Sequence, residues 1–180
     1  INDIPFSTLG ERSRLIQWDK VPFPLLSSDS KSKIDWSYVN YGALRRNESF
    51  ELHHADWIKI NQSSASEQAY QDLINQRSNN RIINSEVAAA LDYSKVNFRI
   101  LDLNNFADIN TLPFDNIGAT TSKLPWHKFD FSQFSSKTLE SIDWSLVNYA
   151  QLFRNTTFKL DHIDLDEINS SNQSRSFYRH

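Results

Sequence analysis

The octapeptide IDWSYVNY at residues 34–41 recurs almost unchanged as IDWSLVNY at residues 142–149. The two copies lie 108 residues apart, and the same offset aligns residues 1–72 with residues 109–180 without a gap, with 29 of the 72 pairs identical. A repeat of this length predicts a repeated structure. We therefore expect one continuous repeat array, with a first long unit at residues 1–108 and a partial second unit at residues 109–180.

A shorter motif recurs inside these units. An apolar residue and Asp precede a large apolar residue, and after two variable positions come Val or Ile and then Asn. The motif begins at Ile34, Ala55, Leu91, Ile142 and Ile163. Within each unit, successive tryptophans are 18 or 21 residues apart. A period near 20 residues is typical of solenoids, in which each coil buries its apolar face against its neighbours.

The motif predicts a short helical turn. Asp is a favourable N-cap, the large apolar residue and the Val three positions later share one face, and Asn tolerates the left-handed conformation that ends such a turn. Longer helices are predicted at residues 66–77, 84–91 and 135–142, where good helix formers carry apolar residues at helical spacing. We therefore predict a mainly α fold, a solenoid of short helices in coils of about 18–21 residues.

Residues 91–105 support an alternative. They form three consecutive quintets of apolar residue, Asp or Asn, large apolar residue and two variable positions. These quintets resemble those of the pentapeptide-repeat family. The resemblance implies a square right-handed β-helix. Elsewhere the quintets come only in pairs and are interrupted by segments that are out of phase with five. A β-solenoid or a mixed α/β coil remains the alternative fold.

The Asp-Trp-Ser and Val-Asn-Tyr boxes, best matched at residues 34–41 and 142–149, resemble the degenerate repeats of very large exported or surface proteins of bacteria. The resemblance implies a structural or interaction module, acting as a spacer, scaffold or adhesive surface. It carries over no catalytic residue. The Gly-rich calcium nonapeptide of the best-known exported repeats is absent from this sequence.

The composition excludes several functional classes. The 180 residues include neither Cys nor Met, which rules out disulfides, thiolate nucleophiles and cysteine-ligated metals. The net charge of −3 argues against a nucleic-acid partner, and no apolar run reaches the length needed for membrane insertion. Abundant Ser and Asn, together with the lack of oxidisable Cys and Met, predict an extracellular or cell-surface protein.

The aromatic residues at repeated positions are predicted to form the structural core, because such positions are the ones that successive coils use to contact each other. These residues are Trp18, Trp36, Trp57, Tyr93, Trp126 and Trp144. The alternative is a surface that stacks on sugar rings. That surface would more readily use aromatics that the other copy lacks, such as Tyr38, opposite Leu146, or Phe153, opposite Arg45.

Two His/Asp pairs, at equivalent repeat positions, are candidate metal ligands: His54 with Asp56, and His162 with Asp164. Imidazole and carboxylate groups at this spacing suit Zn²⁺ or another divalent cation. The simpler interpretation is that both Asp residues are N-caps and both His residues belong to polar turns. No other cofactor is expected, and a ligand-binding module for carbohydrate or a divalent cation is the alternative function.

Catalytic motifs are absent from the sequence, which has no nucleophile elbow, no His-Glu-x-x-His and no phosphate-binding Gly-rich loop. We therefore expect a non-enzymatic protein whose partner is a protein or glycan surface, with further repeats stacking on its ends. Five Asn-x-Ser/Thr sequons, at Asn47, Asn61, Asn155, Asn169 and Asn172, are close to the number expected by chance and carry little weight.

Overall fold

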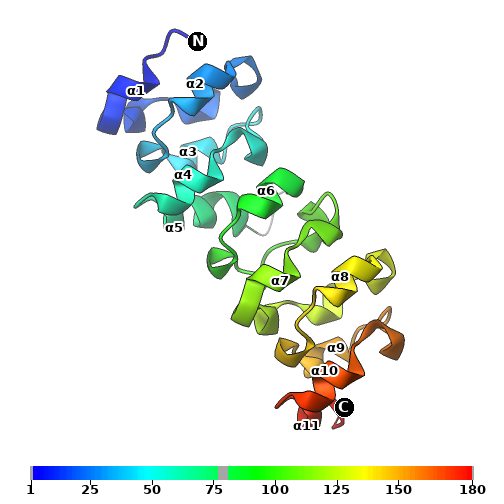
Figure 1. Ribbon diagram of the computed structural model, residues 1–180. Coiled ribbons are helices and arrows are strands. Elements are labelled where there is room, and N and C mark those ends of the chain that lie inside the picture. The colour runs from blue at the N-terminus through cyan, green and yellow to red at the C-terminus, as the bar shows by residue number, and fades with distance from the viewer. Residues whose placement is uncertain (1, 77–80, 180) are drawn as a thin grey trace.

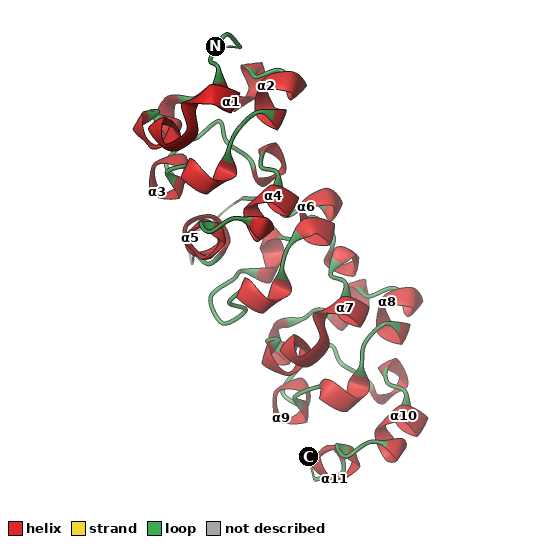
Figure 2. Ribbon diagram, turned by 60° about the vertical axis from the view of Figure 1, so that its left-hand side comes forward, coloured by secondary structure: helices red, strands yellow, loops and turns green. Residues whose placement is uncertain are grey.

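The computed structural model describes residues 2–76 and 81–179, and over them the chain is mainly helical. Short helices follow one another from the N-terminal end of an elongated molecule to its C-terminal end (Figure 1). No strand is present in the described residues (Figure 2), where the β-type pairing is a single parallel bridge between Ile83 and Phe106. The prediction of a mainly α protein is confirmed, and the described chain does not adopt the alternative β-solenoid.

None of the described α-helices is longer than six residues. They are α1 (Phe6–Leu9), α2 (Ser28–Ser32), α3 (Tyr41–Leu44), α4 (Trp57–Gln62), α5 (Ser66–Ala69), α6 (Ser85–Ala90), α7 (Phe114–Ile117), α8 (Ser136–Glu140), α9 (Tyr149–Leu152), α10 (Leu165–Ser170) and α11 (Ser174–Phe177). Isolated helices this short are unstable in water. Their stability must therefore come from packing between successive elements.

Short 3₁₀ helices fill most of the intervals between the α-helices. They are η1 (Gly10–Leu15), η2 (Trp18–Lys20), η3 (Phe23–Leu25), η4 (Trp36–Tyr38), η5 (Leu52–His54), η7 (Tyr93–Lys95), η8 (Leu103–Asn105), η9 (Ile109–Thr111), η10 (Gly118–Lys123), η11 (Trp126–Lys128), η12 (Phe131–Gln133), η13 (Trp144–Leu146) and η14 (Leu160–His162). The helix predicted at residues 66–77 consists of α5 followed by a π-helical segment, η6 (Tyr70–Ile74), and its end at Arg77 lies outside the described residues. The other two predicted helices form as α6 and α8.

The 108-residue offset of the sequence is also an offset of the structure. Each of the ten helical elements from α1 to α5 has a counterpart from α7 to α11, and every pair has the same bounds once 108 is added. Helix α1 becomes α7, for example, and η4 becomes η13. Gly10 and Gly118, which follow α1 and α7, both have positive φ values, 48° and 54°, that residues with a Cβ rarely adopt.

The predicted Asp caps are confirmed. In each motif the carboxylate accepts a hydrogen bond from a backbone N–H two or three residues later, which satisfies one of the donors that the start of a helix leaves unpaired. The capping residues are Asp35, Asp56, Asp92, Asp143 and Asp164. The quintets at residues 91–105 also contain such caps. Asp92 caps η7 and Asp102 caps η8, and neither is part of a β-helix.

The predicted role of the motif Asn is wrong. Every described residue with positive φ is a glycine, so no Asn ends a turn in the left-handed conformation. Asn40 and Asn148 instead begin the next helix, with φ near −80° and side-chain oxygens that accept N–H groups of Ala43 and Gln151. An Asn side chain can satisfy an N-terminal N–H as well as Asp does, and this gain favours the cap.

Six of the large aromatic residues share one anchoring contact. Each of the six donates from its indole N–H or phenol O–H to the backbone carbonyl five residues earlier, so its ring is buried while its polar group is satisfied. These pairs are Trp18 to Ser13, Tyr41 to Trp36, Trp57 to Leu52, Tyr93 to Ala88, Trp126 to Thr121 and Tyr149 to Trp144. Nε1 of Trp36 is buried and has no partner in the described chain.

Segments far apart in the sequence, here called layers, are joined by side chains of one segment that bind the backbone of another. Asn47 is buried, and its Nδ2 donates to the carbonyl oxygens of Trp18 at 2.6 Å and Val21 at 2.8 Å. Asn155 repeats this clamp on Trp126 and Phe129. The partners are 26 and 29 residues apart.

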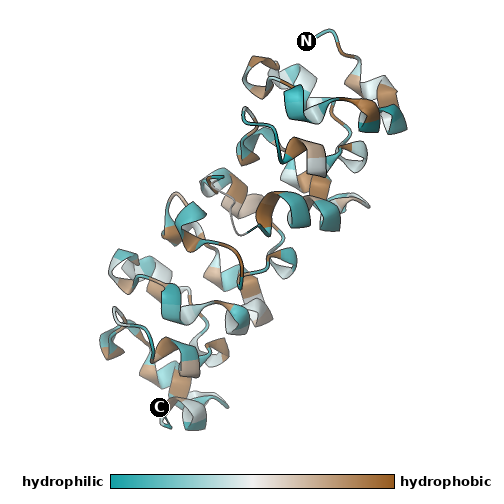
Figure 3. Cartoon of the chain, turned by 180° about the vertical axis from the view of Figure 1, so that it is seen from behind, coloured by the Kyte–Doolittle hydropathy of each residue, from teal (hydrophilic) through white to brown (hydrophobic). Residues whose placement is uncertain are grey.

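The apolar residues form one cluster that runs through the array. Brown, apolar positions recur along the whole length of the chain in Figure 3, with hydrophilic positions between them. The described chain therefore has one continuous apolar core.

Candidate functional site

All six aromatic residues predicted for the core are buried, with Trp18 and Trp126 fully enclosed. They are therefore not available to stack on a sugar. Tyr38 and Phe153 are half-buried as well, with Tyr38 covered by the guanidinium of Arg14 and Phe153 packed against Phe177. Among the Phe, Tyr and Trp side chains of the described chain, Tyr178 alone is exposed.

His54 and His162, at the same repeat position, make the same hydrogen bond. Nδ1 of His54 accepts the backbone N–H of Glu51 at 3.0 Å, and Nδ1 of His162 accepts that of Lys159 at 3.1 Å. An imidazole nitrogen that accepts a hydrogen bond is unprotonated. Each ring therefore closes the 3₁₀ turn that contains it.

Both rings also stack on a core phenylalanine. His54 lies over Phe23 with ring centroids 5.6 Å apart, and His162 lies over Phe131 at 5.5 Å. Burial, together with the nearby His53, lowers the pKa of His54 to about 4. His54 is therefore neutral at physiological pH.

The two Asp residues predicted as metal ligands are the N-caps of α4 and α10. Asp56 accepts the N–H of Lys59 at 3.0 Å and lies 3.4 Å from its ammonium group, while Asp164 accepts the N–H groups of Asp166 and Glu167. No group of three His, Asp or Glu side chains suited to a metal ion is found in the part of the chain that the structure describes. The divalent-cation site stays a prediction, and both His/Asp pairs have structural contacts that do not require it.

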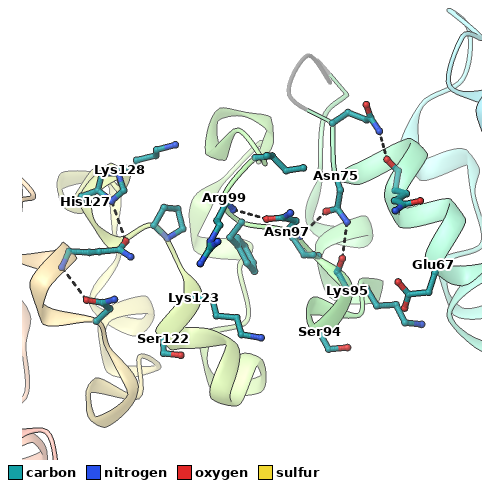
Figure 4. Close-up of a pocket in the computed structure, with 18 of the residues that line it drawn as sticks. Glu67, Asn75, Ser94, Lys95, Asn97, Arg99, Ser122, Lys123, His127 and Lys128 are labelled. Atoms are coloured by element: carbon teal, nitrogen blue, oxygen red, sulfur yellow. Dashed lines mark hydrogen bonds between the residues drawn. The ribbon is translucent and has the colours of Figure 1, made fainter.

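A groove of about 1100 Å³ lies where the end of the first unit meets the second (Figure 4). One side comes from η6 and η7, and the other from η10 and η11. On the first side, Asn75 joins the end of η6 to the chain around η7, because its Nδ2 donates to the carbonyl of Lys95 and its Oδ1 accepts the N–H of Asn97. The polar lining is thus fixed by backbone hydrogen bonds.

Positive charge dominates one part of the groove. Arg99, Lys123 and Lys128 are exposed, and no carboxylate of the described residues lies within ion-pair distance of them. Lys95 is held by Asp92 at 3.5 Å, so it contributes less to the field. Unpaired cations in a concave surface attract anionic groups.

Some groove residues change between the two copies, whereas much of the core is conserved between them. Lys123 of the groove corresponds to Leu15, and His127 corresponds to Asp19. Nine buried apolar positions are identical in both copies: Phe6, Trp18, Phe23, Ile34, Trp36, Val39, Tyr41, Leu44 and Ile60. No pattern in the sequence predicts this groove, because its residues come from segments about 25 residues apart that share no motif.

The sequons at Asn47 and Asn155 also have a structural explanation. The Oδ1 of Asn47 accepts the N–H and the hydroxyl of Ser49, and Asn155 does the same with Thr157. The Ser or Thr two residues later therefore belongs to the clamp. A glycan on the Asn47 Nδ2 would replace one of its two N–H groups and so remove at least one of the two bonds that this atom donates.

No helix of the described residues is long and apolar enough to cross a membrane. Comparison with protein-family models, curated proteins and solved structures finds no match for this chain.

Proposed function

We propose that this chain is a non-enzymatic interaction module, built as an α-solenoid, that serves as a scaffold for protein partners in a larger exported or surface protein. The groove between the two units is its partner-binding surface. The observation that carries the proposal is a concave groove with three exposed cations that no carboxylate of the described residues pairs. Repeat scaffolds use their concave surfaces for binding.

The charge of the groove indicates the partner. Arg99, Lys123 and Lys128 present three cations across one concave surface, and the guanidinium of Arg99 can bind a carboxylate with two parallel hydrogen bonds. The overall charge of −3 does not favour a polyanion such as nucleic acid. A short protein segment with a few Asp and Glu residues matches the three cations and carries less negative charge than nucleic acid.

The placement in an exported or surface protein rests on the sequence. The lack of Cys and Met and the resemblance to exported bacterial repeats support it. The elongated shape suits a spacer or scaffold, because successive layers hold the two ends far apart (Figure 1).

A charge-reversal experiment tests the proposal. A fluorescein-labelled peptide of alternating Glu and Ser residues is titrated with the full chain at low ionic strength. We expect binding that weakens as salt is added, because exposed charges are screened. The triple variant Arg99→Glu, Lys123→Glu, Lys128→Glu should abolish it.

A matched control separates the groove from general charge effects. Lys20 occupies in the first copy the position of Lys128 in the second and is also exposed. Lys128→Glu should weaken peptide binding, and Lys20→Glu, with the same change in net charge, should not. Equal loss in both variants, or no binding by the unmodified chain, would refute the proposed groove.

A further inference from the structure

The C-terminal end of the array exposes a surface that is buried at the equivalent place inside the molecule. Its residues are Leu160, Leu165, Asn169 and Tyr178, which we call the end face. We propose that the end face binds a repeat segment with the chemistry of residues 81–108. This inference rests on the proposed repeat architecture and is independent of the charged groove.

Exposure at matched positions shows how strongly the end face differs from its internal counterpart. Leu52 is 1% exposed, whereas its counterpart Leu160 is 59% exposed. Trp57 is 3% exposed, whereas its counterpart Leu165 is 44% exposed. Apolar side chains grouped in this way mark an interaction surface more often than isolated ones do.

The tyrosine position shows the same contrast. Tyr70 is fully buried, whereas its counterpart Tyr178 is 65% exposed. The ring of Tyr70 also lies 5.9 Å from the ammonium of Lys95, a residue of the 81–108 segment. The end face therefore leaves open the tyrosine face that this segment occupies internally.

The segment that covers the internal surface is known, because it belongs to this chain. Helix α6 packs against both η5 and α4, which carry Leu52 and Trp57. The same segment is bound through its backbone, since Nδ2 of Asn61 donates to the carbonyl of Ala90 at 2.8 Å and the hydroxyl of Tyr70 accepts the N–H of Asp92. Residues 81–108 therefore form both the apolar cover and the polar contacts.

The end face already holds its polar groups in the binding arrangement. The hydroxyl of Tyr70 donates to Oδ1 of Asn61 at 2.9 Å, and the hydroxyl of Tyr178 donates to Oδ1 of Asn169 at the same distance. The pair is thus preorganised, which reduces the entropy lost on binding. The pair can bind a carbonyl through the Asn amide and an N–H through the Tyr hydroxyl, where the carbonyl and the N–H are two residues apart in an extended link.

These contacts define the chemistry of the occupant. It carries a short N-capped apolar helix like α6, then an extended link ending at an Asp like Asp92. The link supplies the carbonyl for Asn169 and the N–H for Tyr178. A peptide of residues 81–108 from this chain has these features and is the appropriate probe.

Fluorescence anisotropy of a labelled peptide of residues 81–108, titrated with the full chain, tests the inference. We expect saturable binding. Tyr178→Phe removes one acceptor and should weaken binding about tenfold, which corresponds to the loss of one hydrogen bond. Leu160→Asp, which places a charge on an exposed apolar position, should abolish it.

Two control variants make the result specific. Tyr70→Phe makes the same substitution where the surface is already filled, so peptide affinity should not change. The groove variant Lys128→Glu should also bind the peptide normally, which separates this inference from the proposed partner groove. No binding by the folded chain, or equal weakening by Tyr178→Phe and Tyr70→Phe, would overturn the inference. Self-association of the chain that Leu160→Asp abolishes, seen by sedimentation velocity, would identify a second copy as the occupant and overturn it too.

Discussion

Replacing Asn47 by Asp tests whether the buried asparagine clamps hold successive layers together. The substitution keeps the size and shape of the side chain and changes one amide nitrogen into an oxygen. That nitrogen now donates to the carbonyl oxygens of Trp18 and Val21 at 2.6 and 2.8 Å. In the variant at neutral pH, an anionic oxygen would face both carbonyls inside the core.

The expected loss follows from these contacts. Two hydrogen bonds contribute about 1 kcal/mol each, and the Trp18 carbonyl left without a donor costs at least about 1 kcal/mol. The Val21 carbonyl still accepts the hydroxyl of Ser49 at 3.1 Å. The free energy of unfolding should therefore fall by about 3 kcal/mol. The bonds that Oδ1 accepts from Ser49 remain, since a carboxylate oxygen accepts as well as an amide oxygen.

Urea unfolding followed by far-UV circular dichroism measures the change. Asn155→Asp, which alters the equivalent clamp, should lower the unfolding midpoint as well, whereas Asn172→Asp, at an exposed sequon, should leave it within about 0.5 kcal/mol of the unmodified chain. A loss below about 1 kcal/mol in Asn47→Asp would show that the clamps do not join the layers.

Two further predictions concern single buried groups. Trp18→Phe breaks the 2.8 Å hydrogen bond to the Ser13 carbonyl, whereas Trp36→Phe removes an N–H that has no partner in the described chain. In thermal unfolding, Trp18→Phe should therefore destabilise the chain by about 1–2 kcal/mol more than Trp36→Phe does. Equal losses would contradict the role of the hydrogen bond of Trp18. The pKa of His54 is about 4 in the folded chain and 6.5 in the unfolded chain. As the pH falls, His54 therefore binds a proton first in the unfolded chain, and the free energy of unfolding should decline between pH 6.5 and pH 4. His54→Asn, whose amide oxygen can still accept the Glu51 N–H, should show a smaller decline in urea titrations across this range, and an unchanged pH profile would argue against a neutral, buried His54.

Local features of this protein could be predicted from residues close together in the chain. The Asp caps and the three longer helices depend on interactions within a few residues, and over the described residues they appear where the sequence places them. The 108-residue repeat is visible in the sequence itself. The Asn at the end of the motif was misassigned because capping and the left-handed conformation both favour Asn. Only the position of the next helix decides between them, and here α3 begins directly after Asn40.

The sequence by itself therefore determined which residues repeat and which start helices. The tertiary structure decided how the layers are joined, why Asn47 belongs in the core, and which cations share a groove. The physical reason is that these features depend on contacts between residues 20 or more positions apart, such as Asn47 with Trp18 and Asn75 with Asn97. No local periodicity encodes such pairings, because the apolar pattern specifies that a face is buried and leaves open which layer buries it.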